Sequence, residues 1–269
     1  MQDASHHEKG HVELHGVEDF AAMRRAGKLA AEVMDFITPY VVPGARTGDL
    51  DELCDKFTRD HGATSAPLGY RGYPRATCIS PNHVVCHGIP GDKRLEDGDI
   101  VNIDITVLLD GWHGDTSRMF LVGDKIGVKA RKLVDVTYEC LMMGIEAVKP
   151  GATFGDIGHA IQTHAEAAGF SIVRDFCGHG VGKVFHTQPS VLHYGEAGKG
   201  DRILRGMFFT IEPMINAGRY DVKVLGDGWT AVTKDKSLSA QFEHMVGVTD
   251  SGAEIFTLSP KGWHRPPYD

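Results

Sequence analysis

Two acidic residues stand inside the most apolar segments of this 269-residue chain. Asp104 is preceded by Val-Asn-Ile and followed by Ile-Thr-Val, and Glu212 is preceded by Phe-Phe-Thr-Ile and followed by Pro-Met. A second acid follows each of them, Asp115 after the first and Glu243 after the second. A buried carboxylate without a partner costs several kcal/mol, so all four side chains need a compensating charge.

Two kinds of positive charge could compensate these carboxylates. One is pairing with Lys or Arg, which is the ordinary explanation for a single buried acid. The other is a pair of divalent cations, which carboxylate oxygens bind well. The segments around the four acids carry almost no internal Lys or Arg. The pattern therefore favours a divalent metal site.

One histidine has a setting that suits the same site. His179 lies between two glycines in the string Cys-Gly-His-Gly-Val-Gly, directly after an apolar run that ends at Phe176. A histidine in a glycine loop is usually a turn residue, and we expect the glycines to let the backbone turn tightly and expose the ring. Together with four convergent acids, His179 is predicted to be a neutral imidazole ligand.

An internal repeat indicates how these residues are positioned. Pro43–Leu50 aligns with Pro150–Ile157 at an offset of 107 residues, with five of eight positions identical. The same offset carries Asp104 to within one residue of Glu212. We therefore predict two copies of one structural unit, each of which contributes two carboxylates to a site between them.

Each copy is expected to contain two helices followed by strands. Periodicity and helix-end signals predict helices over Glu18–Ile37, Gly48–His61, Val128–Val148 and Phe154–Ala168. Apolar, β-branched runs predict strands over Cys78–Ile79, Ile100–Leu109, Ser117–Val122, Ser171–Phe176, Met207–Ile215, Trp229–Thr233 and Gln241–Thr249. Asp110-Gly111 is a hairpin signal. The expected fold class is α+β, with helices that back a mainly antiparallel sheet.

Composition excludes several classes of protein. The net charge is −8, from 28 basic and 36 acidic residues, which argues against a dedicated nucleic-acid coat. No apolar run reaches the length of a membrane span, and the polar N-terminus shows no secretory signal. The five cysteines are odd in number and form no C-x-x-C pair, which indicates reduced thiols and a cytoplasmic location.

The N-terminus holds a separate histidine cluster. His6, His7, His11 and His15 fall in the first fifteen residues, and their spacing matches no metal motif. Residues 1–15 are expected to form a polar, flexible arm, and residues 16–269 a single domain with halves of about 16–125 and 126–258.

Six strings in this order resemble the bacterial type I methionine aminopeptidases, over nearly the whole chain from about Gly16 to about Leu258. They are Cys86-His87-Gly88-Ile89-Pro90, Asp99 to Asp104, His113 to Ser117, Cys177 to Gly182, Phe209 to Met214 and Ser239 to His244. The resemblance implies the "pita-bread" fold, an internally duplicated α+β domain with pseudo-two-fold symmetry, which agrees with the repeat.

The resemblance also implies a dinuclear metal centre. Its ligands would be Asp104, Asp115, His179, Glu212 and Glu243, with Asp115 and Glu243 bridging the two ions. The ions would be Co, Mn, Fe or Zn, and a bridging hydroxide would attack the scissile carbonyl. Glu212 would carry the proton to the leaving amine. The implied reaction removes the initiator methionine from nascent chains that have a small second residue.

Further positions match the family's substrate contacts. His186 would stabilise the oxyanion, and His87 would contact the amide of the second residue. The methionine pocket would be lined by Tyr70, Tyr73, Cys78, Phe185 and Trp229. The chain departs from the family at Pro67, where relatives often carry Cys, and a reagent that targets that thiol should therefore fail here.

Other proteins with this fold have other functions, and the sequence argues against each of them. Xaa-Pro aminopeptidases and prolidases generally carry a large additional N-terminal domain, and only about fifteen residues precede the similarity. The type II enzymes carry a helical insertion before the last ligand, whereas Glu212 and Glu243 are 31 residues apart here. A metal-free binding protein of this fold would have lost ligands. Expected partners are nascent polypeptides and the ribosome, and we expect a monomer with no membrane contact. Arg24, Arg25 and Lys28 form a small basic cluster that could contribute to ribosome contact, but the sequence favours a solvated helix face.

Overall fold

The computed structural model describes residues 12–268. Its helices begin and end within two residues of the predicted bounds. They are α1 (Val17–Ile37), α2 (Thr47–Asp60), α3 (Val128–Glu146) and α4 (Phe154–Ala167), with short 3₁₀ turns η1 (Thr38–Tyr40) and η2 (Tyr70–Gly72). Local capping explains two of the starts, because Asp19 accepts the Gly16 N–H and Asp156 accepts the Thr153 N–H.

The strands form four small sheets in which every pairing is antiparallel. The first half contributes β1 (Thr64–Ser65), β2 (Cys78–Pro81), β3 (Val84–Cys86), β4 (Ile100–Leu109) and β5 (Trp112–Leu121). The second half contributes β6 (Ser171–Ile172), β7 (Gly178–Gly180), β8 (Thr187–Val191), β9 (Phe208–Ile211), β10 (Met214–Asn216), β11 (Val222–Val224), β12 (Ala231–Thr233), β13 (Ser239–Gln241), β14 (His244–Val248) and β15 (Ala253–Ile255). The sheet orders are β1-β4-β2 with β5 on β4, β13-β10-β6, β11-β12-β3 and β15-β14-β9-β7-β8.

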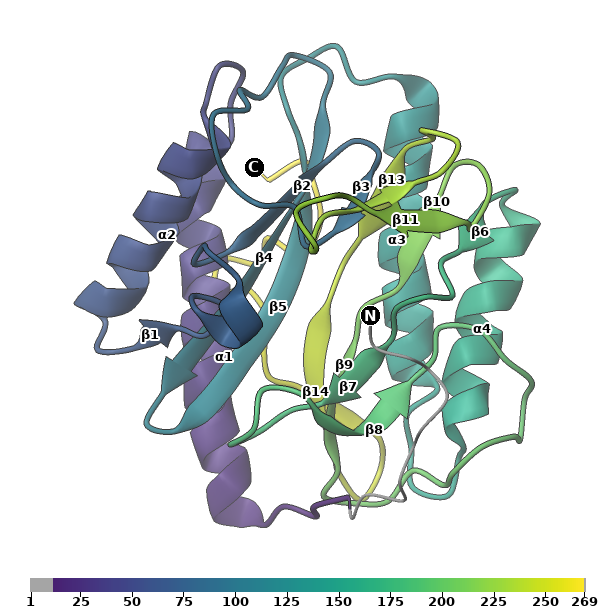
Figure 1. Ribbon diagram of the computed structural model, residues 1–269. Coiled ribbons are helices and arrows are strands. Elements are labelled where there is room, and N and C mark those ends of the chain that lie inside the picture. Colours follow the sequence, from purple (N-terminus) through teal and green to yellow (C-terminus); the bar gives the residue numbers. More distant parts are fainter. Residues whose placement is uncertain (1–11, 269) are drawn as a thin grey trace.

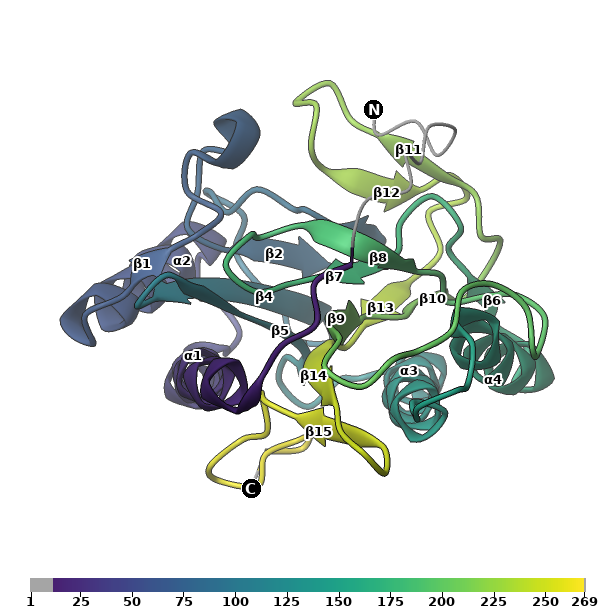
Figure 2. The ribbon, with the colours of Figure 1, turned by 90° about the horizontal axis from the view of Figure 1, so that it is seen from below.

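The helices back the sheets as expected, and Figure 2 shows α1 and α3 on the same side of the strands, with β14 and β15 between them. Helix α1 packs on β4 and β5, and α3 packs on β9, β10 and β13. Helices α2 and α4 lie outside them, α2 against α1 and α4 against α3 (Figure 1). The order of helix, helix and strands therefore occurs twice, and each copy has its own buried apolar core.

The β4–β5 hairpin forms at the predicted turn. Asp110 and Gly111 both have positive φ, 51° and 81°, and Leu109 pairs with Trp112 on either side of them. The second strand begins at Trp112, five residues before the predicted start. Gly114, which weakens the strand signal, is required by packing, because a Cβ there would lie 2.2 Å from the Ala26 carbonyl oxygen of α1.

The second half corrects another expectation. The predicted strand Met207–Ile215 is broken into β9 and β10, and Gln241–Thr249 is broken where β13 ends and β14 begins. The break in the first run falls at Pro213, which has no N–H to donate to a neighbouring strand. Glu212 and Glu243 consequently lie at the breaks between strands and not in the middle of them.

The domain begins earlier than residue 16. Val12 packs against the core of the second half, and the ring of His15 stacks on Phe208 with centroids 4.1 Å apart. The backbone N–H of His15 also donates to the Gly206 carbonyl at 2.8 Å. The expected arm therefore does not extend to residue 15. His6, His7 and His11 lie outside the described residues.

Candidate metal centre and substrate pocket

The first half positions two carboxylates on one face of a regular hairpin. In the β4–β5 register, Asp104 is opposite Ser117 and Thr106 is opposite Asp115. Because side chains alternate along a strand and cross-strand partners share a face, Asp104 and Asp115 are diagonal neighbours. The Thr106 hydroxyl donates to Asp115 Oδ1 at 2.7 Å, which fixes the direction of that carboxylate.

The second half positions His179 on a strand and not in the loop expected from its glycines. Strand β7 lies between β8 and β9, and neither flanking glycine has a positive φ. A Cβ at Gly178 would lie 2.4 Å from the Thr210 carbonyl oxygen, and one at Gly180 would lie 2.0 Å from the Gln188 carbonyl oxygen. The glycines therefore permit a close approach of neighbouring strands, which holds the ring of His179 in place.

Glu212 is held by three hydrogen bonds, two that its carboxylate accepts and one that its backbone donates. Thr210 Oγ1 donates to Glu212 Oε1 at 2.8 Å, and Gln241 Nε2 donates to Oε2 at 3.2 Å. The backbone N–H of Glu212 donates to Nε2 of the buried His193 at 3.1 Å. The break in the strand therefore does not leave this carboxylate free to reorient.

Glu243 is placed by the junction between the two halves. Its N–H donates to the Ser117 carbonyl at 3.1 Å, and its own carbonyl accepts the Thr116 hydroxyl at 2.8 Å. Ser117 is also opposite Asp104 in the β4–β5 ladder. This junction brings the last acid of the second half beside the hairpin of the first.

The five residues selected from the sequence converge at this junction. One ligand atom from each of Asp115, His179 and Glu243 lies within 4.8 Å of the others. His179 Nε2 is 3.5 Å from Asp115 Oδ2 and 3.6 Å from Glu212 Oε1. Asp104 belongs to the same group through its place beside Asp115 on the hairpin face.

The electrostatics show that the group is incomplete by itself. Burial raises the pKa of Asp115 to about 7, and burial together with neighbouring carboxylates raises the pKa of Asp104, Glu212 and Glu243 well above the usual range. In the described part of the chain, no Lys or Arg forms an ion pair with any of the four. Within the described residues, these carboxylates therefore either hold protons or take positive charge from a bound cation.

The imidazole in this group is prepared to act as a ligand. Burial lowers the pKa of His179 to about 4, so the ring is neutral at pH 7. Its Nδ1 lies 3.1 Å from the Gly180 carbonyl oxygen, which accepts the ring proton. Nε2 therefore presents a lone pair toward the carboxylates.

The remaining predicted residues form an aromatic wall beside the acids. His186 packs on His179 with ring centroids 4.1 Å apart, and Tyr70 stacks on His186 at 5.2 Å. Phe185 lies 4.9 Å from Tyr70. The aromatic wall thus starts at His186, which contacts the candidate ligand His179, and continues through Tyr70 to Phe185.

A second group of rings adjoins the first-half strands. Tyr73 packs edge-on against Trp229 at 5.1 Å, and Trp229 lies 6.1 Å from His87. Cys78 is directly opposite Asp104 in the β2–β4 register. Burial lowers the pKa of His87 to about 4 and, with neighbouring positive groups, that of His186 to about 2, so both rings are neutral at pH 7.

Pro67 lies beneath the loop that carries Tyr70. It is buried, and its carbonyl accepts the Tyr70 N–H at 3.0 Å. The residue that departs from the family pattern therefore shapes the turn that carries Tyr70 to its contacts with Phe185 and His186.

Sequence reasoning missed the supporting residues. Thr106, Thr210, His193 and Gln241 hydrogen-bond to the ligands but carry no signal of their own. The two threonines could have been found, because each is two residues from an acid of its own strand segment and therefore shares a face with it. His193 and Gln241 are brought in by tertiary packing alone.

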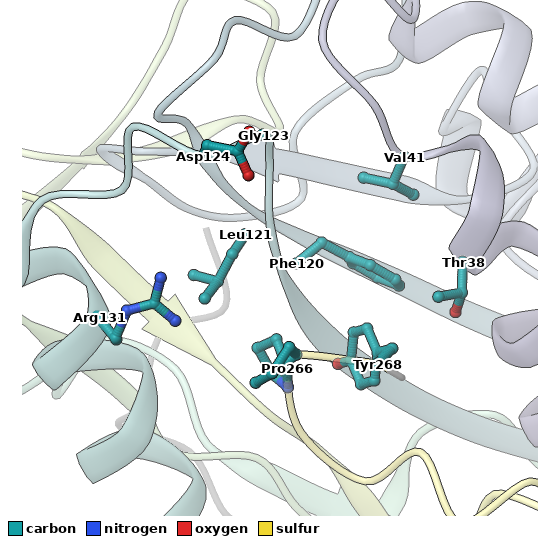
Figure 3. A pocket seen from close by; sticks show the side chains of 10 residues that line it. Thr38, Val41, Phe120, Leu121, Gly123, Asp124, Arg131, Pro266 and Tyr268 are labelled. Atoms are coloured by element: carbon teal, nitrogen blue, oxygen red, sulfur yellow. The ribbon is translucent and has the colours of Figure 1, made fainter.

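A separate hollow of about 320 Å³ lies away from the carboxylates, at the end of β5 (Figure 3). It is bounded by Thr38 of η1 and Val41, by Arg131 in the first turn of α3, and by the C-terminal segment at 266–268. None of the predicted site residues lines it.

A family model described as "Metallopeptidase family M24" matches residues 21–250. The chain belongs to this metallopeptidase family. It is 58% identical to a methionine aminopeptidase of Rickettsia prowazekii over 96% of this chain and 99% of the relative. It is 55% identical to a methionine aminopeptidase of Escherichia coli over 90% of this chain and 92% of the relative. The resemblance to the bacterial type I enzymes and the assignment as an aminopeptidase, a hydrolase, are confirmed.

Solved structures confirm the duplicated pita-bread fold. The crystal structure of methionine aminopeptidase from Rickettsia prowazekii has a TM-score of 0.91 and covers 92% of this chain and 100% of its own. That from Thermotoga maritima is 38% identical, with a TM-score of 0.90, 92% of this chain covered and 99% of its own. A prolidase from Pyrococcus furiosus, 23% identical with a TM-score of 0.73, covers 91% of this chain and 65% of its own, and it shares the fold.

Two surface expectations can be compared with the structure. Arg24, Arg25 and Lys28 each have an acidic partner, namely Glu254, Asp110 and Glu32. The basic cluster is thus a helix face with paired charges. Among the described residues, no helix has the length and apolar character that crossing a membrane requires.

Proposed function

We propose that this protein removes the initiator methionine from polypeptides that have a small second residue, with two divalent ions held by its five convergent ligands. The observation that carries the proposal is the approach of Asp115, His179 and Glu243 to within 4.8 Å beside a wall of aromatic rings. The names of the relatives support the choice of methionine.

The donor set fits a pair of divalent ions. Four buried carboxylates and one neutral imidazole match the ligand preferences of Co, Mn, Fe and Zn. Asp115 and Glu243 would be shared between the ions, Asp104 would complete one, and His179 with Glu212 would complete the other. When bound, the ions supply an acidified water and polarise the scissile carbonyl.

Glu212 is suited to hold and move a proton. Its pKa is well above the usual range, and Oε2 accepts only a long hydrogen bond from Gln241, whereas Oε1 is committed to Thr210. We assign to Glu212 the transfer of a proton from the nucleophile to the leaving amine.

The two neutral histidines are suited to bind the substrate backbone. His186 lies against His179 and has its Nδ1 buried without a partner in the described residues, so this ring has a hydrogen-bonding atom to offer to a ligand. We assign it to the carbonyl oxygen as negative charge develops there. His87, beside Trp229, is assigned to the amide of the second residue.

The ring walls account for a methionine side chain in the pocket. Tyr70 and Phe185 form one side, while Tyr73 and Trp229 form the other, and thioether sulfur packs favourably against aromatic rings. Cys78, opposite Asp104, adds a second soft sulfur near the acids. Apolar walls of this kind favour methionine over charged or polar N-terminal residues.

The setting of the reaction is part of the same proposal. Nascent polypeptides are the substrates, the chain acts as a monomer in the cytoplasm, and the ribosome is a partner through a surface other than the paired basic face of α1.

The test measures methionine release from Met-Ala-Ser, with Met-Leu-Ser and an Xaa-Pro peptide as competitors. We expect fast release from Met-Ala-Ser only, loss of it in EDTA and recovery with Mn(II) or Co(II). Elemental analysis of anaerobically purified protein would identify the ions and their number. Cleavage that EDTA does not affect, or preference for the Xaa-Pro peptide, would overturn the proposal.

A further inference from the structure

One buried hydroxyl contacts two of the candidate ligands. Thr210 lies in β9 with none of its surface exposed. Its Oγ1 accepts the backbone N–H of His179 at 3.0 Å and donates its single proton to Glu212 Oε1 at 2.8 Å. Within residues 12–268 no other side chain hydrogen-bonds to both His179 and Glu212.

The packing around this hydroxyl leaves little freedom. A Cβ at Gly178 would lie 3.2 Å from Thr210 Oγ1 and 2.4 Å from its carbonyl oxygen. Strand β7 can therefore approach β9 closely only because residue 178 is glycine. The same close approach brings the His179 N–H within reach of the hydroxyl.

The other supporting residues each contact one ligand. Gln241 and His193 hydrogen-bond to Glu212, and Thr106 hydrogen-bonds to Asp115. Removing any one of these leaves in place the two hydrogen bonds by which the Thr210 hydroxyl joins His179 to Glu212. Removing the Thr210 hydroxyl releases both at once and leaves the His179 N–H without an acceptor.

We propose that Thr210 is the positioning residue that holds His179 and Glu212 as one unit. His179 Nε2 and Glu212 Oε1 are thereby kept 3.6 Å apart and directed toward the same ion site. The inference rests on the proposed metal centre and goes beyond it by naming what sets the geometry of one ion site before metal binds. Partners behind the ligands typically contribute about 10–100-fold to metal affinity.

The experiment compares Thr210→Val with Thr210→Ser. Valine keeps the branched shape without the hydroxyl, and serine keeps the hydroxyl without the methyl group. Thr137→Val is the matched control, because Thr137 is also fully buried and its hydroxyl donates to the Leu133 carbonyl within α3 and not to any candidate ligand. Calorimetric titration of Mn(II) into EDTA-stripped protein, and the visible spectrum of the Co(II) form, report on the site independently of turnover.

We expect Thr210→Val to weaken Mn(II) binding at one of two sites by about 10–100-fold and to change the Co(II) spectrum. It should also lower kcat for Met-Ala-Ser more than it raises KM. Thr210→Ser and Thr137→Val should bind Mn(II) as the wild type does.

Unchanged Mn(II) affinity in a folded Thr210→Val would overturn the inference, as would equal losses in Thr210→Val and Thr137→Val. If the valine variant does not fold, Thr210→Ala against Thr210→Ser decides, since the two differ by one oxygen; equal Mn(II) affinities there would also overturn it. Failure of the wild type itself to bind Mn(II) would instead overturn the proposed function.

Discussion

The two halves of the molecule supply the same kind of ligand from different backbones. In the first half, Asp104 and Asp115 stand on two ten-residue strands that pair without interruption from Ile100 to Leu121. In the second half, Glu212 and Glu243 stand where short strands end and the chain passes from one sheet to another.

The difference shows two ways to fix a carboxylate. A regular ladder fixes side-chain direction through the backbone, so Asp115 needs one additional hydrogen bond, from Thr106. At a break the backbone gives less direction, and side chains replace it: Thr210, Gln241 and His193 together hold Glu212. Single substitutions of residues that hydrogen-bond to the ligands should therefore lower metal affinity more in the second half than in the first.

The largest effect is expected at Glu243, a second-half residue that is joined to the first half and is proposed to bind both ions. Glu243→Gln keeps the shape but cannot carry the negative charge, so kcat/KM should fall about 10⁴-fold, as when one member of a catalytic unit is removed. Metal content should fall with it. The control is Asp110→Asn at the exposed hairpin tip, where asparagine tolerates the positive φ. Substantial activity in Glu243→Gln would contradict a shared ligand.

A smaller and more selective effect is expected at His186. Alanine there removes a group assigned to the developing oxyanion, so kcat should fall about 10²–10³-fold while metal content stays near that of the wild type. Steady-state kinetics with elemental analysis of the same preparation measure both. Retained kcat with lost metal would refute the assigned role.

The comparison of halves is tested directly by the two threonines. Thr106→Val removes the single hydroxyl donor to Asp115, but the ladder remains, so we expect Mn(II) affinity to fall by no more than about 10-fold. Thr210→Val should lower Mn(II) affinity by a larger factor. The measurement is the ratio of the Mn(II) dissociation constants of the two variants. A larger loss of Mn(II) affinity in Thr106→Val would show that a regular strand ladder does not compensate for a lost side-chain hydrogen bond.

The smallest effect concerns stability and pH without metal. The raised pKa values of the four carboxylates mean that the folded state keeps protons which the unfolded state releases. The contribution of these groups to the free energy of unfolding is therefore full at low pH and is lost as the pH rises through their folded-state pKa values. Buried histidines such as His179 act in the opposite direction, but only below their ordinary pKa of about 6.5.

In EDTA the melting temperature should therefore fall by several degrees from about pH 7.5 to 8.5, a range in which these histidines are almost fully neutral in both states. Mn(II) should raise the melting temperature most at the upper end of this range. A metal-free melting temperature that rises over the same range would contradict the burial of uncompensated carboxylates.

The sequence predicted the parts of the site that follow from local pattern. Asp104 stands out because an acid interrupts an alternation of β-branched residues, and the offset of 107 then leads to Glu212. The helices also follow from periodicity and caps. Residues that act through tertiary approach were not predictable: nothing near His193 indicates that its Nε2 accepts the Glu212 N–H.

The glycines around His179 show why local reasoning failed there. In the sequence, Gly178 and Gly180 predict a tight turn, because glycine most often serves that purpose. The structure uses them to make room for Thr210 and Gln188 on neighbouring strands. A pattern of glycines cannot by itself distinguish a turn from a close approach, since both need a missing Cβ.

The junction between Ser117 and Glu243 has a consequence for how such a protein could originate. Each half holds only two of the four carboxylates, and these meet because a backbone hydrogen bond and a bond from the Thr116 hydroxyl join the halves at this point. An ancestral chain of one half could have assembled four carboxylates only by pairing with a second copy of itself. Fusion of the two copies would then have freed each half to diverge, one toward an unbroken hairpin and the other toward His179 and its broken strands.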